Sequence, residues 1–294
     1  MNFLVNFKRI IMAAVFCCTA AQGWWLSGSQ DQKQLNAQLW KAVKDNNLQQ
    51  VQAALNAGAE IDTKDNNDWT PLHWSSNKGH VNIVRLLLEK NATVDAKSKL
   101  VRTPLHVAAG EGHIDIVRLL LEKNAAINAQ NNNGNTPLHR ATANGHVDIV
   151  RLLLENNAAI NAKNDGGTTP LHVATGEGNI DIVRLLLEKN AAINAKNNND
   201  WTPLHVAAMN GHVDIAKLFL EKNAAIDAKN NDGWTPLHWA AIKGSVDVVR
   251  LLLENNAPID AQENNGLTPL HLAEMNGRVD VVELLVANRS ATIS

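Results

Sequence analysis

Histidine is the residue type in this chain best suited to chemistry, since an imidazole can bind a metal ion or act as a general acid or base near neutral pH. The chain has 11 histidines, and every one falls at a repeated position. Because none is left over for an independent ligand set, we expect these side chains to hold loops through hydrogen bonds, and we predict no metal site. Seven end a Thr-Pro-Leu-His motif, and four follow a glycine further along: His73, His106, His139, His172, His205, His238 and His271, then His80, His113, His146 and His212.

The other residue types that support catalysis show no arrangement typical of an active site. Cys17 and Cys18 are adjacent, and no later cysteine could complete a zinc site or a disulfide. There is no Gly-rich phosphate loop and no nucleophile elbow, and acidic residues recur at regular spacing instead of pairing. The sequence therefore predicts no enzymatic activity and no cofactor. An undetected hydrolase or transferase is the alternative, which a substrate-turnover screen would expose.

Composition excludes several broad classes of protein. Hydrophobic residues make up 45% and charged residues 19% of the 294 positions, which fits neither a disordered chain nor one embedded in a membrane. The formal net charge is −2, with 27 basic and 29 acidic residues. Binding to nucleic acid depends on clustered Lys and Arg that neutralise phosphates. The sequence shows no such cluster, so we predict no nucleic-acid partner.

The first 21 residues have the layout of a cleavable secretory signal. Lys8 and Arg9 precede a 12-residue apolar run that ends in small residues. A helix of that length spans about 18 Å, which is too short for a bilayer core of about 30 Å. We predict a signal peptide over residues 1–21, cleaved after Ala21 or alternatively after Ala20, and a linker over residues 22–33.

Other readings of this leader remain open. An uncleaved leader would tether the protein to a membrane, and a third possibility is an apolar helix packed on the first repeat. A bacterial lipoprotein is disfavoured because the bulky Phe16 precedes Cys17. With the signal removed, we expect an exported chain, periplasmic or secreted, without stable membrane insertion.

A repeat organises the rest of the chain. The motif Thr-Pro-Leu-His begins at seven threonines with a constant spacing of 33 residues. Thr is a good helix N-cap and Pro fits the first helical position, so each motif predicts a short helix ended by a glycine such as Gly112. A second, amphipathic helix follows, as over residues 114–122, and Asn124 closes it. The Asn/Asp/Gly-rich residues 128–135 predict a projecting loop. The threonines are Thr70, Thr103, Thr136, Thr169, Thr202, Thr235 and Thr268.

These motifs together resemble the ankyrin repeat: Thr-Pro-Leu-His-x-Ala-Ala, Gly-His and Ile-Val-x-Leu-Leu-Leu at a 33-residue period. The resemblance covers residues from about 34 to 288. It implies an all-α ankyrin-repeat solenoid of stacked helix–turn–helix units with projecting β-hairpin loops, whose concave face grips protein partners. We predict a degenerate capping repeat over residues 34–66, seven repeats over 67–288 and a tail over 289–294.

Positions that vary between nearly identical repeats indicate the binding surface, because the framework does not dictate them. Three positions are informative: the residue before each motif threonine, the residue after each motif histidine, and the residue three further on. They are strongly apolar towards the C-terminus, and exposed tryptophan is common at binding hot spots. The alternative is that stacked loops bury part of each ring. The predicted partner-binding residues are Trp201, Met209, Trp234, Trp239, Ile242, Leu267, Leu272 and Met275, with a second contact at Trp69 and Trp74.

One loop departs from the pattern. Residues 97–102 replace the Asn/Gly-rich tip and place Val101 where other repeats have Gly or Asp. A β-branched residue is costly at positive φ, so we expect this loop to adopt a different turn. The loop is either a specificity element or a tip that has drifted in sequence.

The sequence as a whole predicts a monomeric, non-catalytic adaptor or decoy that binds a protein partner. With its signal-like leader it resembles small secreted or periplasmic ankyrin proteins of bacteria, including host-associated ones. A periplasmic protein that supports or protects a resident enzyme is the main alternative, which the compartment and the co-purifying proteins would distinguish.

Overall fold

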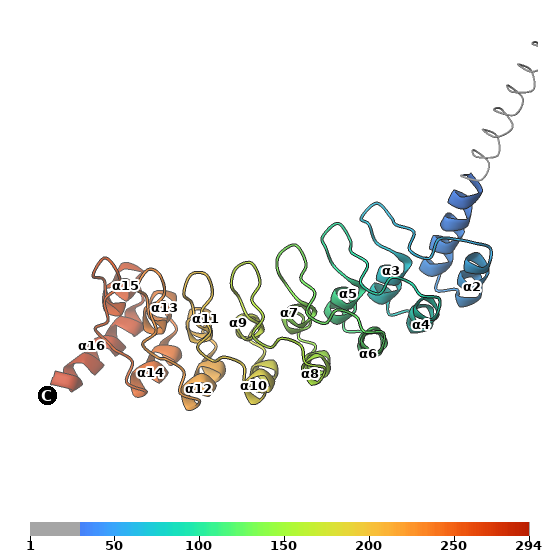
Figure 1. Cartoon of the computed structure of the whole chain (residues 1–294). Coiled ribbons are helices and arrows are strands. Elements are labelled where there is room, and N and C mark those ends of the chain that lie inside the picture. The colour runs from blue at the N-terminus through green and yellow to red at the C-terminus, as the bar shows by residue number, and fades with distance from the viewer. Residues whose placement is uncertain (1–29, 294) are drawn as a thin grey trace, which may run out of the picture. The chain divides into compact units, whose positions relative to one another are not determined.

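The computed structural model describes residues 30–293, and the chain divides into two compact units at Lys99. The predicted signal peptide and residues 22–29 of the predicted linker lie outside the described residues. Within the described part, no helix combines the length and the apolar character needed to cross a membrane. Figure 1 shows the helices and the loops that connect them.

The first unit contains the predicted capping repeat. A helix over residues 30–44 is followed by α2 (Leu48–Asn56), α3 (Pro71–Lys78) and α4 (Val81–Glu89). Leu39 and Val51 are fully buried, as expected for a repeat that closes the core. The predicted linker boundary is wrong, because residues 30–33 are helical. Gln32 Nε2 ties this turn to the unit by donating to Asn36 Oδ1 at 3.0 Å and to the carbonyl of Gly58 at 3.1 Å.

The second unit consists of paired helices with a loop before each pair. In Figure 1 the first helix of each pair lies next to the projecting loops, and the second helix lies further from them. The pairs are α5 (Pro104–Glu111) and α6 (Ile114–Glu122), α7 (Pro137–Ala143) and α8 (Val147–Glu155), α9 (Pro170–Gly176) and α10 (Ile180–Glu188), α11 (Pro203–Asn210) and α12 (Val213–Glu221), α13 (Pro236–Lys243) and α14 (Val246–Glu254), and α15 (Pro269–Met275) and α16 (Val279–Ile293).

Helix boundaries follow the predicted capping chemistry. In α5, Thr103 Oγ1 accepts from the N–H of His106 at 3.4 Å, and the Thr103 N–H donates to His106 Nδ1 at 3.2 Å. Gly112 ends this helix at a φ of 87°, and Asn124 ends α6 at a φ of 57°. Both are left-handed conformations that glycine and asparagine tolerate best, which confirms the prediction for these positions.

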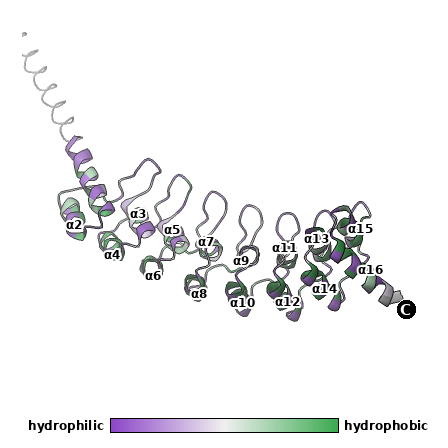
Figure 2. Ribbon diagram, turned by 180° about the vertical axis from the view of Figure 1, so that it is seen from behind, coloured by the Kyte–Doolittle hydropathy of each residue, from purple (hydrophilic) through white to green (hydrophobic). Residues whose placement is uncertain are grey.

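The second helices supply most of the apolar core. In α6, Ile116, Val117 and Leu120 are fully buried, whereas Arg118 and Glu122 are exposed, as the helical spacing predicted. Figure 2 shows the same division along the second unit, with hydrophobic colour concentrated on the helices and pale or polar colour on the loops. Each helix pair therefore depends on its neighbours to cover its apolar side.

The projecting loops are hairpin turns without strands, since no residue from 30 to 293 is assigned to a strand. Asn131 Oδ1 accepts from the N–H groups of Asn133 and Asn135 at 2.9 and 3.1 Å and so organises the turn from within. One backbone bond joins this loop to the preceding one, from Asn132 N–H to the Leu100 carbonyl at 3.2 Å. The same organising side chain recurs at Asp65, Asn164, Asn197, Asn230 and Glu263.

The C-terminal helix is longer than its counterparts. Residues 289–293 continue α16, so the predicted tail boundary is wrong. In the repeat alignment Arg289 stands where the other repeats have a left-handed asparagine such as Asn256, with a φ of 61°. Arginine does not favour that conformation, and the helix therefore continues. Arg289 Nε instead pairs with Asp260 Oδ1 at 3.1 Å.

The loop containing Val101 keeps the turn of its neighbours, contrary to the prediction of a different turn. Val101 has a φ of 55°, close to the 59° of Asp200 and the 71° of Gly134 at matching positions. The stacking of loops explains why: the Leu100 carbonyl must accept the hydrogen bond from Asn132. The strain at Val101 is the consequence.

Replacing Val101 with Gly should raise the free energy of unfolding by about 1 kcal/mol. The left-handed conformation costs a residue with a side chain about 1–2 kcal/mol, and the greater freedom of glycine in the unfolded chain offsets part of the gain. Urea unfolding followed by circular dichroism would measure the change. The same substitution at Val206, inside helix α11, should destabilise the chain. A lower unfolding midpoint for Val101→Gly would contradict the assignment of strain.

Candidate functional site

The motif histidines connect neighbouring repeats. His205 Nδ1 accepts from the Thr202 N–H at 3.1 Å and lies 2.8 Å from the Thr202 hydroxyl, while Nε2 lies 3.0 Å from the carbonyl of Trp234 in the next loop. Because Nδ1 accepts an N–H, the proton must be on Nε2, which donates to that carbonyl. The matching bonds run from His106 to Asn135, His139 to Thr168, His172 to Trp201 and His238 to Leu267.

Burial keeps these imidazoles neutral. Desolvation is the main cause that lowers the pKa of His106 and of His205 to about 4, and the carbonyl bonds only partly oppose it. The pKa values of His139, His172 and His238 are lowered for the same reason. A shifted pKa often marks a catalytic residue. Here Nδ1 caps the helix of its own repeat and Nε2 joins that repeat to the next, so the shift reflects the framework role that the sequence predicted.

Two of the histidines that follow a glycine, His146 and His212, bind backwards along the stack. His146 Nε2 lies 3.0 Å from the carbonyl of Gly110, and His212 Nε2 lies 3.4 Å from that of Gly176. Arg278 takes this role in the last repeat, where its Nε donates to the Ile242 carbonyl at 3.0 Å. The sequence predicted hydrogen-bonding roles for these positions, and the structure identifies the acceptors.

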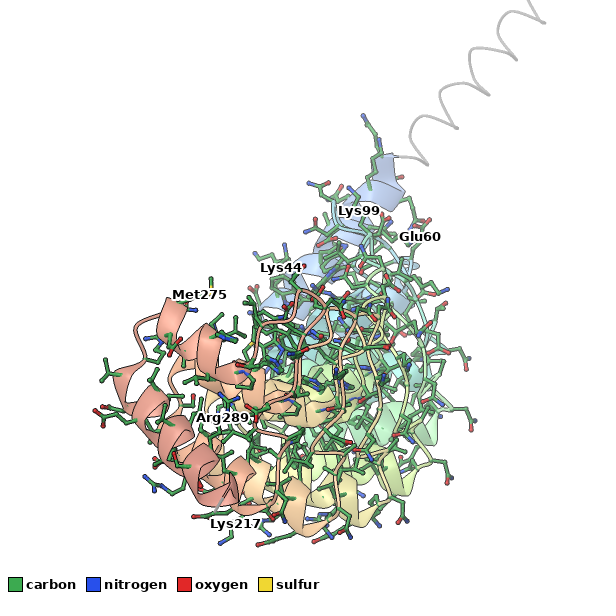
Figure 3. All side chains as sticks on the ribbon, turned by 90° about the vertical axis from the view of Figure 1, so that its left-hand side faces the viewer. Lys44, Glu60, Lys99, Lys217, Met275 and Arg289 are labelled. Atoms are coloured by element: carbon green, nitrogen blue, oxygen red, sulfur yellow. The ribbon has the colours of Figure 1, made fainter. Side chains whose placement is uncertain are left out.

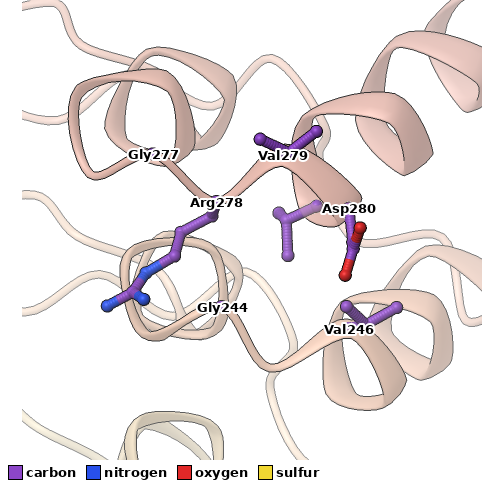
Figure 4. Close-up of a pocket in the computed structure, with 7 residues that line it drawn as sticks. Gly244, Val246, Gly277, Arg278, Val279 and Asp280 are labelled. Atoms are coloured by element: carbon purple, nitrogen blue, oxygen red, sulfur yellow. The ribbon is translucent and has the colours of Figure 1, made fainter.

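The most regular hollows are by-products of this packing. Figure 4 shows one of them, where the Arg278 side chain reaches towards the turn at Gly244. Equivalent hollows lie around His212 and around His146, one at each matching junction. A hollow that recurs with the repeat is set by the framework and gives no sign of a dedicated ligand. Among residues 30–293, no group of three metal-binding side chains comes together. The hollow in Figure 4 is lined by Gly244, Val246, Gly277, Arg278, Val279, Asp280 and Val281.

The three variable positions define what we call the inner face, on the side of the loops and first helices. Its most notable feature is a cluster of tryptophans in the second unit. The Trp239 ring lies between two others, 4.4 Å from the Trp201 ring and 4.6 Å from the Trp234 ring by centroids. All three remain partly exposed. Residues 33 and 38 apart in sequence thus form one aromatic surface, which we call the tryptophan cluster.

The polar groups of Trp234, at one side of the cluster, are held by hydrogen bonds. The backbone N–H of Trp234 donates to Asn230 Oδ1 at 2.8 Å, and the Trp234 side chain hydrogen-bonds to Glu263. The Leu267 N–H is the main cause that lowers the pKa of Glu263, and Trp234 contributes. Sequence analysis did not single out Glu263. The sequence could have indicated Glu263, because it stands at a repeat position where the other repeats have Asn, Asp or Ser.

The other predicted contact residues of the second unit separate into three groups. Met209 on α11, Ile242 on α13 and Leu267 in the loop before α15 are partly exposed. Met275 is 72% exposed, and in Figure 3 its side chain points away from the ribbon. Leu272 is only 4% exposed and belongs to the core, so its prediction as a contact residue is wrong. Val107, at the same repeat position, is also buried, with 6% of its surface exposed.

The first unit holds a smaller aromatic site. The Trp69 and Trp74 rings lie edge to face, with 6.4 Å between their centroids. Lys44 Nζ and Lys78 Nζ each lie 5.4 Å from the centre of the Trp74 ring, and Lys44 also lies 5.7 Å from that of Trp40. These cation–π contacts were not predicted, because Trp40 and Lys44 lie in the degenerate repeat where the motif gives no register.

Comparison with known proteins agrees with this architecture. A family model described as "Ankyrin repeats (3 copies)" matches residues 39–131, 93–164, 124–197, 158–230 and 224–294. A curated protein from Medicago truncatula, "Protein VAPYRIN-LIKE", is 40% identical over 48 residues. That match covers 16% of this chain and 10% of the relative. The chain thus spans about a tenth of the length of that relative, and the match bears on the repeat alone.

Replacing His205 with Asn should cost less stability in mild acid than at neutral pH. Folding keeps the imidazole neutral, with a pKa of about 4, whereas the unfolded chain binds a proton near pH 6.5. The stability from neutral His205 is therefore lost as the pH falls from about 6.5 towards 4, by about 1.4 kcal/mol per pH unit. Urea unfolding at pH 7 and pH 5 should show the cost of His205→Asn shrinking by about 2 kcal/mol.

The substitution Val206→Ala provides the control, because it changes a neighbouring side chain that does not titrate. Its cost should be the same at both pH values. Equal costs for His205→Asn at pH 7 and pH 5, or a wild-type chain that is more stable at pH 5, would contradict the neutral bridging role.

Proposed function

Because this chain belongs to the ankyrin-repeat family, we propose that it binds a partner protein through the inner face of its second unit. Ankyrin repeats are protein-interaction modules and are typically non-catalytic. The observation that carries the proposal is the tryptophan cluster formed by Trp201, Trp234 and Trp239. These residues come from two loops and a helix of adjacent repeats and meet on one surface.

The cluster has the physical properties of a binding anchor. Large aromatic side chains bury much apolar area in an interface, and tryptophan is the residue type most enriched at hot spots. The rings pack against one another at 4.4 and 4.6 Å, so they are already ordered before a partner arrives. Pre-ordering lowers the entropic cost of association. Met209, Ile242 and Leu267 extend the apolar surface around the rings.

Two further contacts belong to the proposal. Met275 adds a flexible apolar side chain on the last repeat, suited to an irregular partner surface. The aromatic site of the first unit, Trp69 and Trp74 with Lys44 and Lys78 beside the Trp74 ring, offers a separate secondary contact. Its lysines favour an acidic patch on whatever covers the ring.

We also propose that the chain acts outside the cytoplasm, in the periplasm or as a secreted protein, with a host protein as one class of partner. The support lies in the basic and apolar layout of residues 1–21. The absence of cysteine after Cys18 adds to it, because such a chain folds equally well in an oxidising compartment.

The double substitution Trp201→Ala and Trp234→Ala should weaken partner binding by about 100-fold or more while the repeats remain folded. Each hot-spot tryptophan contributes about 2 kcal/mol or more, so the two losses exceed the roughly 2.8 kcal/mol that corresponds to 100-fold even when they are only partly additive. Crosslinking in native cells would identify the partner, and calorimetry would then compare the dissociation constants. Val279→Ala, an exposed apolar side chain outside the cluster, is the control and should leave affinity unchanged. Unchanged affinity for the folded double variant would contradict the proposal.

Export predicts a processed N-terminus. Edman sequencing or intact mass of the protein from its native cells should give a chain that begins at Gln22, or at Ala21 if cleavage follows Ala20. Cell fractionation should place it outside the cytoplasm. A chain with an intact Met1 in the soluble cytoplasmic fraction would contradict export. A chain with an intact Met1 in the membrane fraction would instead show that the uncleaved leader tethers the protein to a membrane.

A further inference from the structure

The inner face of the second unit carries a pair of arginines that matches the tryptophan cluster in position but differs in chemistry. Arg102 precedes its motif threonine as Trp201 does, and Arg140 follows its motif histidine as Trp239 does. The two arginines therefore occupy, three repeats earlier, the two positions whose rings meet at 4.4 Å in the cluster. Both are partly buried.

A glycine makes room for the second arginine. A Cβ atom added at Gly110 would lie 3.2 Å from Arg140 Nε and 3.3 Å from Nη2, so the guanidinium lies directly over the helix backbone. Glycine is a poor residue for the body of a helix. Its place in α5 keeps the guanidinium low on the inner face instead of extended into solvent. Arg140 nevertheless remains partly exposed.

Arg140 retains its full capacity to bind an anion. Within residues 30–293 its guanidinium forms no ion pair and no hydrogen bond. A guanidinium has five N–H donors in a fork that matches a carboxylate. A half-buried fork without an acceptor is unusual for a framework residue. By comparison, both ring nitrogens form hydrogen bonds in His106, His139, His172 and His205.

The two positive charges lie close enough to affect each other. The pKa of Arg102 is lowered chiefly by burial and then by the charge of Arg140, while Glu111 acts in the opposite direction. His106 is also affected by both arginines. Glu111 acts on Arg102 less than Arg140 does, so the two guanidinium groups are not offset by this carboxylate. A carboxylate from outside would interact favourably with both.

We propose that Arg102 and Arg140 bind the carboxylate of an Asp or Glu side chain in an extended segment of the partner protein. This inference rests on the proposed function and specifies its ligand. Adjacent helices pack about 10 Å apart, so three repeats place the arginine pair about 30 Å from the tryptophan cluster. An extended chain rises about 3.3 Å per residue. The partner segment therefore carries its acidic residue about nine residues from the apolar residue that covers the tryptophans.

Charge also argues against a nucleic acid at this site. Binding a phosphate backbone requires a continuous run of cations. The inner-face positions between the two sites carry no charge: Asn135, Ala143, Thr168, Val173, Gly176 and Val206. A peptide segment matches both sites when it has one acidic side chain at the arginine pair and apolar side chains at the tryptophan cluster.

Peptide display tests the inference on the intact chain. Random peptides of about 16 residues, long enough to span both sites, are selected on the wild-type chain, on Arg102→Ala with Arg140→Ala, and on Trp201→Ala with Trp234→Ala. Arg118→Ala with Arg151→Ala, on the second helices, is the matched control for loss of two positive charges. Circular dichroism confirms that each variant is folded.

We expect peptides selected on the wild type to carry Asp or Glu about seven to eleven residues from Trp, Phe or Leu. The control should select the same pattern, and the inner-face arginine variant should lose the acidic preference while keeping the apolar one. For a selected peptide, Asp→Asn should weaken binding to the wild type about tenfold or more, and binding to the arginine variant hardly at all.

The outcomes separate the inference from the proposed function. Acidic residues that are absent from the selected peptides, or that persist with the arginine variant, overturn the inference and leave the tryptophan anchor intact. Peptides that depend on the arginines but not on the tryptophans overturn the anchor instead. A phosphoserine in place of the acid that binds more than about tenfold tighter would reassign the site to phosphate. Failure to select any peptide contradicts both.

Discussion

The hydrogen bond from a motif histidine of the second unit to the next loop, made by His106, His139, His172, His205 and His238, is the interaction on which the stack depends. It requires a neutral imidazole whose Nδ1 accepts from the threonine cap, as between His205 and Thr202 at 3.1 Å, and whose Nε2 donates across the repeat boundary, as to Trp234 at 3.0 Å. Each of these side chains therefore fixes the start of its own helix and also holds the next loop in position. The same bond positions Trp201 through His172 and Trp234 through His205. The bridging histidines thereby position the aromatic side chains of the inner face. Both nitrogens of each ring are used in these hydrogen bonds, so none is available for catalysis or metal binding.

This constraint also explains the places where the chain departs from its own pattern. Val101 keeps a left-handed backbone, with a φ of 55°, because the carbonyl of the neighbouring Leu100 accepts a hydrogen bond from Asn132 in the following loop. At the other end, Arg289 replaces an asparagine that would end the helix, and α16 runs on to Ile293. Stacking therefore overrides local preference inside the array, whereas local preference determines the structure at its end. Neither stacking nor local backbone preference dictates the side chains at the inner-face positions. Tryptophan and arginine can therefore occur there without disturbing the repeat.

Most of the fold could be predicted from the sequence, because the 33-residue period, the threonine caps and the closing asparagines are local signals with a single structural solution. The family and the all-α architecture are confirmed. The burial of Leu272 could not be predicted, because the position of a residue within the repeat indicates which side it faces but not how deeply its side chain is buried. The meeting of Trp201 with Trp239, and of Arg102 with Arg140, depends on how a loop leans over the following repeat, and nothing in one repeat encodes that distance. Lys44 was missed because the first repeat lacks the motif that sets the register.

The central claim is that the histidines build the framework and that the inner face of the second unit does the binding. Hydrogen–deuterium exchange of the intact chain, free and with its crosslinked partner identified and added back, tests this most directly. The account predicts slower exchange on binding at residues 201–209 and 234–242 and at the loops before α5 and α7, with little change along α6, α8 and α10. Protection confined to the second helices, or to the hollows around His146 and His212, would contradict it.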